Sequence, residues 1–264
     1  MNSFDDQLAK RRARFELSSS SNNTAHLLPG FVSRGDSFLR DRANQTRYWQ
    51  QLCSQLPHKF DDVALELGIE QQRLVEPETN LDTYLLNLRK LREAIVATRN
   101  TDLVDQVFGL SIKIGVRTGH HQTYVPAIGY MLACNRFQQE HTVYLILHLV
   151  HVTQNYSEAL NLYFKHLAPC PKYHYVLHVI QSWISNDWAR WFKLLESVQL
   201  IPEVYQLMNV GTKKMLQAMV STMSKAYFTY PIADLCLPSR MKVEATGWKV
   251  DDTGFAIIRE RVKR

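Results

Sequence analysis

Residues 141–195 read HTVYLILHLVHVTQNYSEALNLYFKHLAPCPKYHYVLHVIQSWISNDWARWFKLL and carry the same helical pattern twice. The dense apolar segment 141–152 aligns with 173–184, and the segment that begins at Tyr156 aligns with the one that begins at Trp188, at a period of about 32 residues. A polar break precedes the second helix of each copy, at 154–155 and at 185–187, with residue types that suit turns and helix N-caps. Two helices per repeat of this length are typical of a tetratricopeptide-like (TPR-like) solenoid, in which each helical hairpin buries its apolar face on the next.

The helical periodicity extends outward over residues 34–225. Two apolar stripes recur at steps of three and four residues: Leu81, Leu85, Leu88, Leu91 and Ile95, then Leu103, Val104, Val107, Phe108, Ile112 and Val116. Prolines at 57, 77, 126, 169, 171 and 202 fall between such stripes, where we expect them to begin or end helices. No run between Pro57 and Pro231 alternates as a strand would, so this region is predicted to be all-α.

The C-terminal residues have a different pattern. A helix is expected over 213–227, followed by short helices over 231–237 and 239–246. Two β-prone runs then surround Asp252-Thr253-Gly254, which predicts a β-hairpin. Three helices followed by a hairpin is the order of a winged helix, a helix-turn-helix variant with a β wing.

These patterns predict an all-α fold in which a TPR-like helical-repeat solenoid is followed by a C-terminal winged helix with a small β-hairpin. We expect the helical-repeat domain to span residues 34–210 and the winged-helix module to span 211–264. Residues 1–33 are predicted to form a flexible tail, because a basic segment is followed there by a low-complexity polar run at 18–23.

The composition is typical of a soluble, intracellular protein. The chain has 264 residues, 45% hydrophobic and 21% charged, which is enough apolar material for a sizeable core. No segment reaches the roughly 18 uninterrupted apolar residues of a membrane span, and acids stand where a secretory signal has bases. Localisation in the nucleus, the cytoplasm or both is therefore expected. The four cysteines lack Cys-x-x-Cys spacing, so we predict reduced core thiols at Cys53, Cys134, Cys170 and Cys236.

Motifs of catalysis and cofactor binding are absent from the sequence. It contains no glycine-rich phosphate loop, no Gly-x-Ser-x-Gly and no His-Glu-x-x-His. His148 and His151 could share a helix face, as could His174 and His178, but a zinc site needs a third ligand. We interpret these histidines as interior or interfacial side chains, and Trp188, Trp191 and Phe192 as packing residues. The expected protein is not an enzyme and holds no cofactor or metal.

Basic residues are the candidate binding residues. The formal net charge of +6 favours acidic partners, with nucleic acid and acidic peptides among them. One cluster lies near the N-terminus and a second on the winged-helix module: Lys10, Arg11, Arg12 and Arg14, then Arg240, Lys242, Lys249, Arg259, Arg261, Lys263 and Arg264. Charges of this kind suit contact with a nucleic-acid backbone, which tolerates any base sequence. A solvated helix face at the N-terminus and a solubilising C-terminus are the alternative interpretations.

Residues 174–264 resemble the PCI superfamily, which includes subunits of the proteasome lid, the signalosome and translation initiation factors. The resemblance depends on residues 180–195 (IQSWISNDWARWFKLL), on 215–227 (MLQAMVSTMSKAY), on 230–235 (YPIADL) and on 247–255 (GWKVDDTGF). It is greatest to the branch that holds the GANP-type mRNA-export scaffolds and the small proteasome-lid and initiation-factor subunits. The resemblance implies a scaffold whose winged helix pairs with those of other subunits, and several members of the superfamily also bind RNA or DNA.

We therefore expect a non-enzymatic scaffold subunit with a role of the mRNA processing or export type. Its expected partners are other PCI or helical-repeat subunits, with a small acidic protein and RNA or DNA as further candidates, and no membrane. The alternatives are an autonomous winged-helix regulator that binds nucleic acid, or a subunit of the proteasome-lid or translation-initiation type. The segment 239–246 is short and mixed in charge, which weighs against specific reading of the major groove.

Overall fold

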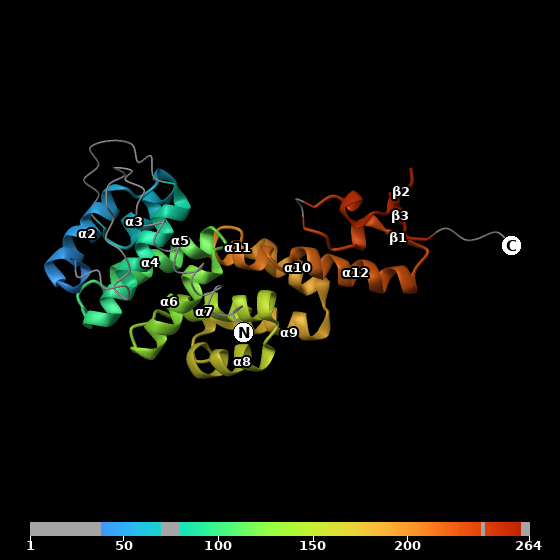
Figure 1. Ribbon diagram of the computed structural model, residues 1–264. Helices are drawn as coiled ribbons and strands as arrows, with labels where there is room; N and C mark the ends of the chain where they lie inside the picture. The colour runs from blue at the N-terminus through green and yellow to red at the C-terminus, as the bar shows by residue number, and fades with distance from the viewer. Residues whose placement is uncertain (1–37, 70–79, 239–240, 260–264) are drawn as a thin grey trace, which may run out of the picture.

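A computed structural model describes residues 38–69, 80–238 and 241–259 of the protein. Helices dominate these residues, and a small antiparallel sheet lies near their C-terminal end (Figure 1). The prediction of a mostly helical fold is confirmed. The α-helices are α2 (Arg42–Ser54), α3 (Asp61–Glu66), α4 (Leu81–Thr98), α5 (Val104–Arg117), α6 (His121–Ala133), α7 (Gln139–His148), α8 (Tyr156–Leu162), α9 (His174–Ser185), α10 (Trp188–Ser197), α11 (Pro202–Asn209) and α12 (Thr212–Ala226).

The helices before α10 gather into a layered body, and α12 leads away from this body to the sheet (Figure 1). The sheet has three strands in the order β1-β3-β2, namely β1 (Thr229–Pro231), β2 (Lys249–Val250) and β3 (Phe255–Ile257). Both pairings are antiparallel, with Tyr230 opposite Ala256 in one and Val250 opposite Ala256 in the other. We call residues 211–259 the C-terminal module.

The repeated helix starts are confirmed. Helix α8 begins at Tyr156 and α10 begins at Trp188, and each is capped by the polar residue before it. The side chain of Asn155 accepts a hydrogen bond from the amide of Glu158 at 3.2 Å, and Asp187 accepts one from the amide of Arg190 at 3.0 Å. Such caps satisfy amides that have no partner within the first helical turn. In the first copy only, π-helical turns extend α7 over Leu149–Thr153 and α8 over Tyr163–Leu167.

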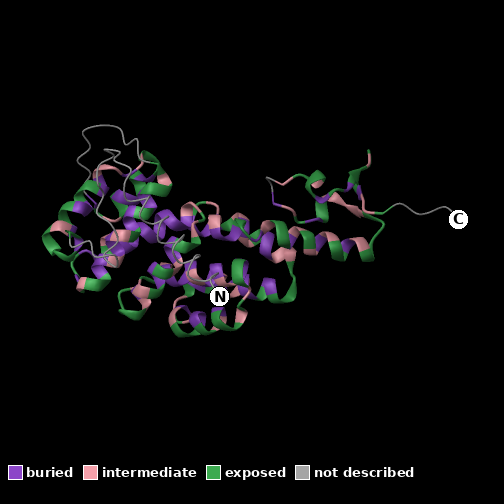
Figure 2. Ribbon diagram, in the orientation of Figure 1, coloured by how far each residue is buried: buried purple, intermediate pink, exposed green. Residues whose placement is uncertain are grey.

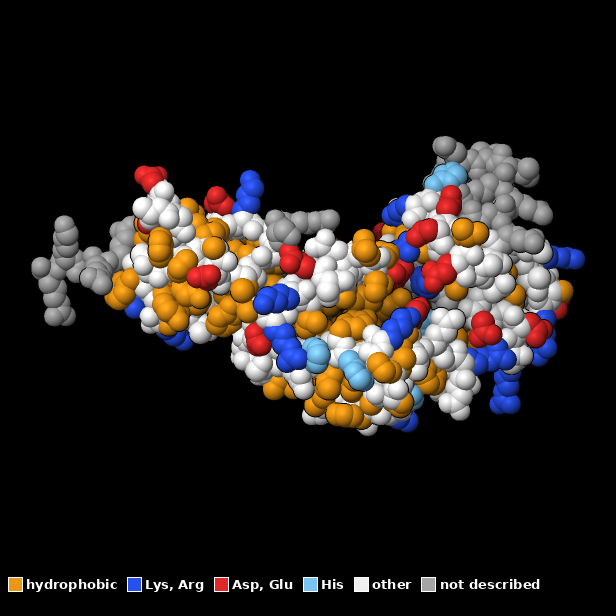
Figure 3. All heavy atoms as spheres, turned by 180° about the vertical axis from the view of Figure 1, so that it is seen from behind, with side chains coloured by type: hydrophobic (Ala, Val, Ile, Leu, Met, Phe, Trp, Pro, Cys, Tyr) orange, Lys and Arg blue, Asp and Glu red, His pale blue; other side chains and the backbone are white. Residues whose placement is uncertain are grey.

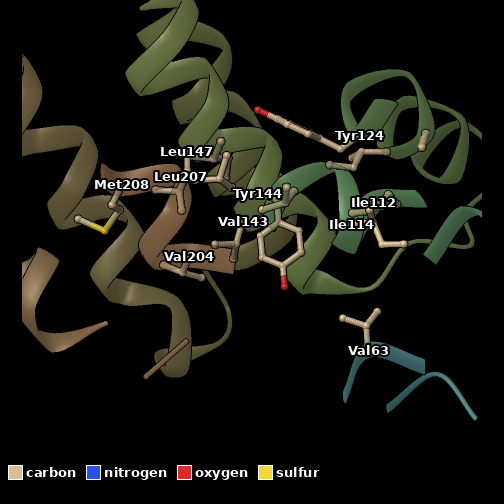
Figure 4. Close-up of a cluster of buried hydrophobic side chains, with 14 of the residues drawn as sticks. Val63, Ile112, Ile114, Tyr124, Val143, Tyr144, Leu147, Val204, Leu207 and Met208 are labelled. Carbon is tan, nitrogen blue, oxygen red and sulfur yellow. The ribbon is translucent and has the colours of Figure 1, made fainter. Parts of the chain in front are cut away.

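The core combines side chains from helices that are distant in the sequence (Figure 4). Val63 of α3, Ile114 of α5, Leu147 of α7 and Leu207 of α11 are all buried in this cluster. Each buried aliphatic side chain of this size contributes about 1.5–3 kcal/mol relative to its exposed state. Figure 2 shows that buried residues concentrate in the helical body and become sparser toward the C-terminal module. The two apolar stripes predicted in α4 and α5 lie in or against this core.

Helix α11 returns to the body and packs against α7 and α5. In a simple solenoid each repeat touches only its neighbours, and α5 lies well before α11 in the sequence. Arg117 of α5 and Glu203 of α11 form an ion pair across this contact, with Nε and Oε1 2.6 Å apart. This ion pair therefore ties α11, near the end of the helical body, to α5 in the middle of the body.

The segment between α12 and the hairpin differs from its prediction. A helix was expected over 231–237, but Pro231 belongs to β1 and only Ile232–Asp234 forms a single 3-10 turn. Cys236 has a φ of 51°, a left-handed conformation that an α-helix does not contain. The helix expected over 239–246 is reduced to a 3-10 turn at Val243–Thr246, with 239–240 outside the described residues. Strand β1 was missed, because three residues carry too little alternation to indicate a strand without their partner β3.

Two further predictions were wrong. Pro126 lies inside α6, where it removes the amide that would bond to the carbonyl of Gln122, instead of beginning or ending a helix. Cys53 is buried as expected, but Cys134 and Cys236 are exposed and Cys170 is half-buried. All four thiols are free, as predicted.

Candidate interaction surface

A stripe of methionines anchors the C-terminal module. Met215, Met219 and Met223 recur every fourth residue along α12 and are buried. Trp248, before β2, and Ala256, at the centre of β3, are buried as well. Methionine fills irregular gaps in a core because its side chain is unbranched and flexible. These five residues are continuous with the hydrophobic cluster of the helical body.

The hairpin between β2 and β3 is held by a carboxylate. Oδ1 of Asp251 accepts hydrogen bonds from the amide of Phe255 at 2.8 Å, the amide of Thr253 at 3.0 Å and the hydroxyl of Thr253 at 2.8 Å. These donors, the amide of Phe255 foremost, hold the pKa of Asp251 below its ordinary value because they stabilise the ionised form. Gly254 completes the turn with a φ of 84°, which favours glycine. The predicted hairpin is confirmed.

Large apolar side chains remain exposed around this hairpin. Tyr227, Phe228, Val250 and Phe255 each leave between 39% and 46% of their surface accessible, and we call these four residues the apolar surface. Val250 is the cross-strand partner of Ala256, so within the sheet it lies on the opposite face from Phe255. Because successive residues of a strand point to opposite faces, Phe255 lies on the face opposite to the buried Ala256. Figure 3 shows hydrophobic side chains gathered over this end of the molecule. Clusters of exposed apolar residues mark sites of association more often than isolated ones do.

Three of the basic residues predicted to bind nucleic acid are described, and all three are exposed. Lys242 precedes the last 3-10 turn, Lys249 lies on β2 and Arg259 follows β3. The exposed acids Glu244 and Asp252 stand among them. Eight predicted residues lie outside the described part of the chain: Lys10, Arg11, Arg12, Arg14, Arg240, Arg261, Lys263 and Arg264.

Arg259 adjoins the apolar surface. Its guanidinium carbon lies 4.2 Å from the centroid of the Phe228 ring, and its amide donates to the carbonyl of Phe228 at 3.2 Å. A cation over an aromatic face is attracted by the ring quadrupole, which stabilises the pair by about 0.5–1 kcal/mol at exposed sites. Arg259, one of the exposed basic residues, therefore borders the apolar surface at Phe228.

A second polar cluster lies inside the helical body, beside a cavity of about 370 Å³. Arg117 pairs with Asp62 and with Glu203, each at 2.6 Å, and Lys113 pairs with Glu66. Each of these carboxylates already has a cation beside it. A general base needs a carboxylate with access to a substrate proton, and this cluster instead ties α3, α5 and α11 together. We interpret it as structural.

His148, His151, Trp191 and Phe192 are buried as the sequence predicts, but His174 is exposed and His178 and Trp188 are half-buried. His148 is hydrogen-bonded to the hydroxyl of Tyr124 at 2.8 Å. His151 accepts a hydrogen bond from the indole of Trp191 at 3.3 Å and contacts the ring of Trp183 edge-on. Burial lowers the pKa of both imidazoles, that of His151 to about 3, so they are neutral at physiological pH.

Among residues 38–69, 80–238 and 241–259, no three His, Cys, Asp or Glu side chains converge as metal ligands. Within the same ranges, no helix combines the length and the apolar character needed to cross a bilayer.

Comparison with known proteins adds no relative to this description. No family model, no curated protein and no solved structure matches the chain.

The sequence had drawn attention to the basic residues of the C-terminal module and not to its apolar ones. Two features of the sequence could have predicted these exposed apolar residues. One is the adjacent pair Tyr227-Phe228, and the other is a hairpin with more apolar residues than a three-stranded sheet of this size can bury.

Proposed function

We propose that the protein is a non-enzymatic scaffold subunit of a multiprotein complex, and that it pairs with another subunit through its C-terminal module. The apolar surface of Tyr227, Phe228, Val250 and Phe255 supports this proposal most directly. Pairing would remove these side chains from water, which stabilises an interface by roughly 25 cal/mol for each Å² of apolar area buried.

The proposal includes a finer description of the architecture. In it the helical pairs form a TPR-like solenoid, and α12 with the sheet forms a winged helix of the PCI type. The matched caps at Asn155 and Asp187 support the repeat, and the β2–β3 hairpin after α12 supports the wing. Two of the three helices expected in a winged helix would then be reduced to the 3-10 turns at 232–234 and 243–246. Such short turns suit a pairing element better than a helix that reads the major groove.

Purification of the full chain from its native cell tests the pairing. A stoichiometric complex with other helical-repeat subunits is expected. Phe255→Asp should release these subunits, because a carboxylate would be buried against apolar side chains. Phe164→Asp is the matched control, since Phe164 is also an exposed phenylalanine but lies on the π-helical turn after α8. A monomer without partners, or equal loss of partners in both variants, would contradict the proposal.

A second candidate function is contact with RNA or DNA, as in a scaffold for mRNA processing or export in the nucleus or cytoplasm. The exposed side chains of Lys242, Lys249 and Arg259 favour it. The test is reversal of charge at Arg259, Arg261 and Lys263, with the affinity for single-stranded RNA measured over a range of salt. Each lost phosphate contact should lower the slope of log K against log salt by about 0.7. An unchanged affinity and slope would remove these residues from consideration.

A further inference from the structure

A groove of about 610 Å³ lies on the helical body, away from the C-terminal module. Residues of α4, α5 and α6 line it, and its volume is in the range of pockets that bind ligands. Its wall is mostly apolar and includes Val96, Phe108, Pro126 and Tyr130. The rings of Phe108 and Tyr130 stack with centroids 4.6 Å apart.

One cation lies in this apolar wall without a counter-ion. Arg92 of α4 is only 7% exposed, and it forms no ion pair with any residue in the described ranges. Its Nη1 donates to the carbonyl of Thr123 at 2.8 Å, and its guanidinium carbon lies 5.9 Å from the centroid of the Phe108 ring. Its Nε is buried and has no hydrogen-bond partner. Arg92 therefore uses only part of its donor capacity within the chain.

Of the neighbouring charges, Arg89 lowers the pKa of Arg92 more than Glu93 raises it. Glu93 is bonded to Arg89, with Oε1 2.9 Å from Nε. Arg89 stands three residues before Arg92 on the same helix face and repels it. Burial, with this repulsion added, lowers the pKa of Arg92 to about 10, so the guanidinium still carries its charge at neutral pH. A buried charge without a partner is costly, and in most proteins it is paired.

We propose that this groove binds an acidic side chain of a partner protein, with a bulky apolar neighbour of that residue seated on the apolar wall. The carboxylate supplies the counter-ion that Arg92 lacks. The apolar neighbour covers Val96, which is 44% exposed, together with the rings of Phe108 and Tyr130. This site stands apart from the pairing proposed for the C-terminal module, and neither depends on the other.

The groove suits a single carboxylate better than a phosphate chain. Only Arg92 is available as a cation, because Arg89 is already paired with Glu93. A nucleic acid needs several cations along its backbone, and the residues that line this groove supply none beyond Arg89 and Arg92.

The probe is a library of short random peptides displayed on phage and selected on the full chain. Selected peptides are expected to carry Asp or Glu beside Leu, Ile, Phe, Tyr or Trp. Each is then synthesised together with its Asn or Gln counterpart and titrated against the full chain. Loss of the charge should weaken binding about ten- to a hundredfold, the range for a hydrogen bond to a charged group. Failure to recover binders, or recovery of peptides without an acid, would overturn the proposal.

Variants then locate the binding. Arg92→Met keeps the apolar stem and should cause the same loss as removal of the peptide's charge, whereas Arg47→Met removes an exposed charge on α2 and should cause none. Arg92→Met also removes the donor to the carbonyl of Thr123, so the melting temperature of the variant is measured beside that of the wild type to separate loss of the fold from loss of binding. Peptide binding that survives Arg92→Met would overturn the proposal.

A second variant covers the case in which Arg92→Met fails to fold. Val96→Glu places a carboxylate beside Arg92 at a half-exposed position and should block the selected peptides. Unchanged binding in this variant would contradict the proposed site. Displacement of the peptides from the wild-type chain by single-stranded polyuridylate, with direct polyuridylate binding lost in Val96→Glu, would assign the groove to nucleic acid and overturn the proposal as well.

Discussion

Arg117 and Glu203 stand 86 positions apart in the chain, yet Nε of Arg117 lies 2.6 Å from Oε1 of Glu203. Glu203 is buried, and Arg117 also reaches Asp62 of α3 at 2.6 Å. One guanidinium thus joins three helices that the sequence separates widely. The arrangement explains how α11 is held against α5 although several helices lie between them in the chain.

Arg117→Met should lower the free energy of unfolding by about 3 kcal/mol, because it leaves the carboxylate of Glu203 buried without a partner. Urea denaturation at neutral pH measures the change. Combining Arg117→Met with Glu203→Met should recover part of the loss, since the apolar pair has no buried charge. Equal destabilisation by the single and double variants would show that the ion pair itself is not what holds α11.

Gly211→Ala should destabilise the protein by about 1–3 kcal/mol through overpacking. A Cβ at this position would come within 2.6 Å of both His151 and Trp183, closer than carbon atoms tolerate. Gly129→Ala in α6 is the matched control, because a Cβ there meets nothing within 4 Å. It should stabilise the helix by about 0.5–1 kcal/mol. Thermal unfolding of the two variants should therefore shift in opposite directions.

The protein should lose stability as the pH falls below about 6.5. Burial lowers the pKa of His141 to about 4 and that of His151 to about 3, whereas both titrate near 6.5 in an unfolded chain. The unfolded state takes up these protons first, so the stabilisation is complete above pH 6.5 and is lost as the pH falls toward 4. Each histidine contributes a slope of up to about 1.4 kcal/mol per pH unit.

The variant His141→Asn isolates this effect. It keeps an acceptor for the amide of Gln138, to which Nδ1 of His141 is bonded at 3.4 Å, but it cannot be protonated in this range. The urea midpoint should depend less on pH in the variant than in the wild type between pH 6.5 and 4. The same pH dependence in both proteins would show that His141 does not contribute.

The two matched caps should have similar energetic value. Asn155→Ala and Asp187→Ala each remove one acceptor from the first turn of a helix, which costs about 1 kcal/mol. Asp187 should show a somewhat larger effect, because its negative charge also interacts favourably with the helix N-terminus. Chemical denaturation checks both values. A negligible effect at both positions would mean that the repeated polar breaks are turns without a capping role.

Much of the helical body could be predicted because its signals are local. The stripe from Leu85 to Ile95 and the polar breaks at Asn155 and Asp187 depend on neighbours within one or two turns, and the structure places them as expected. Pro126 shows the limit of such reasoning. The rule that proline ends a helix describes the cost of one lost hydrogen bond, and packing on both sides of α6 outweighs that cost.

The candidate sites were less predictable. The basic residues of the C-terminal module were visible in the sequence, but the exposure of Phe255 depends on which strand face α12 covers. No sequence pattern distinguishes Arg92 from the other arginines, since its missing counter-ion is visible only once α4, α5 and α6 are assembled.

The sequence by itself determined that the chain is helical, where its repeated helices begin and where its hairpin turns, because periodicity, caps and turn residues act over a few neighbours. Only the tertiary structure decided that β1 is a strand, that α11 returns to α5, which apolar side chains stay exposed, and that Arg92 has no ion pair among the described residues. Those outcomes depend on contacts between segments far apart in the chain. The free energy of such burial and pairing depends on both segments, so neither segment predicts it alone.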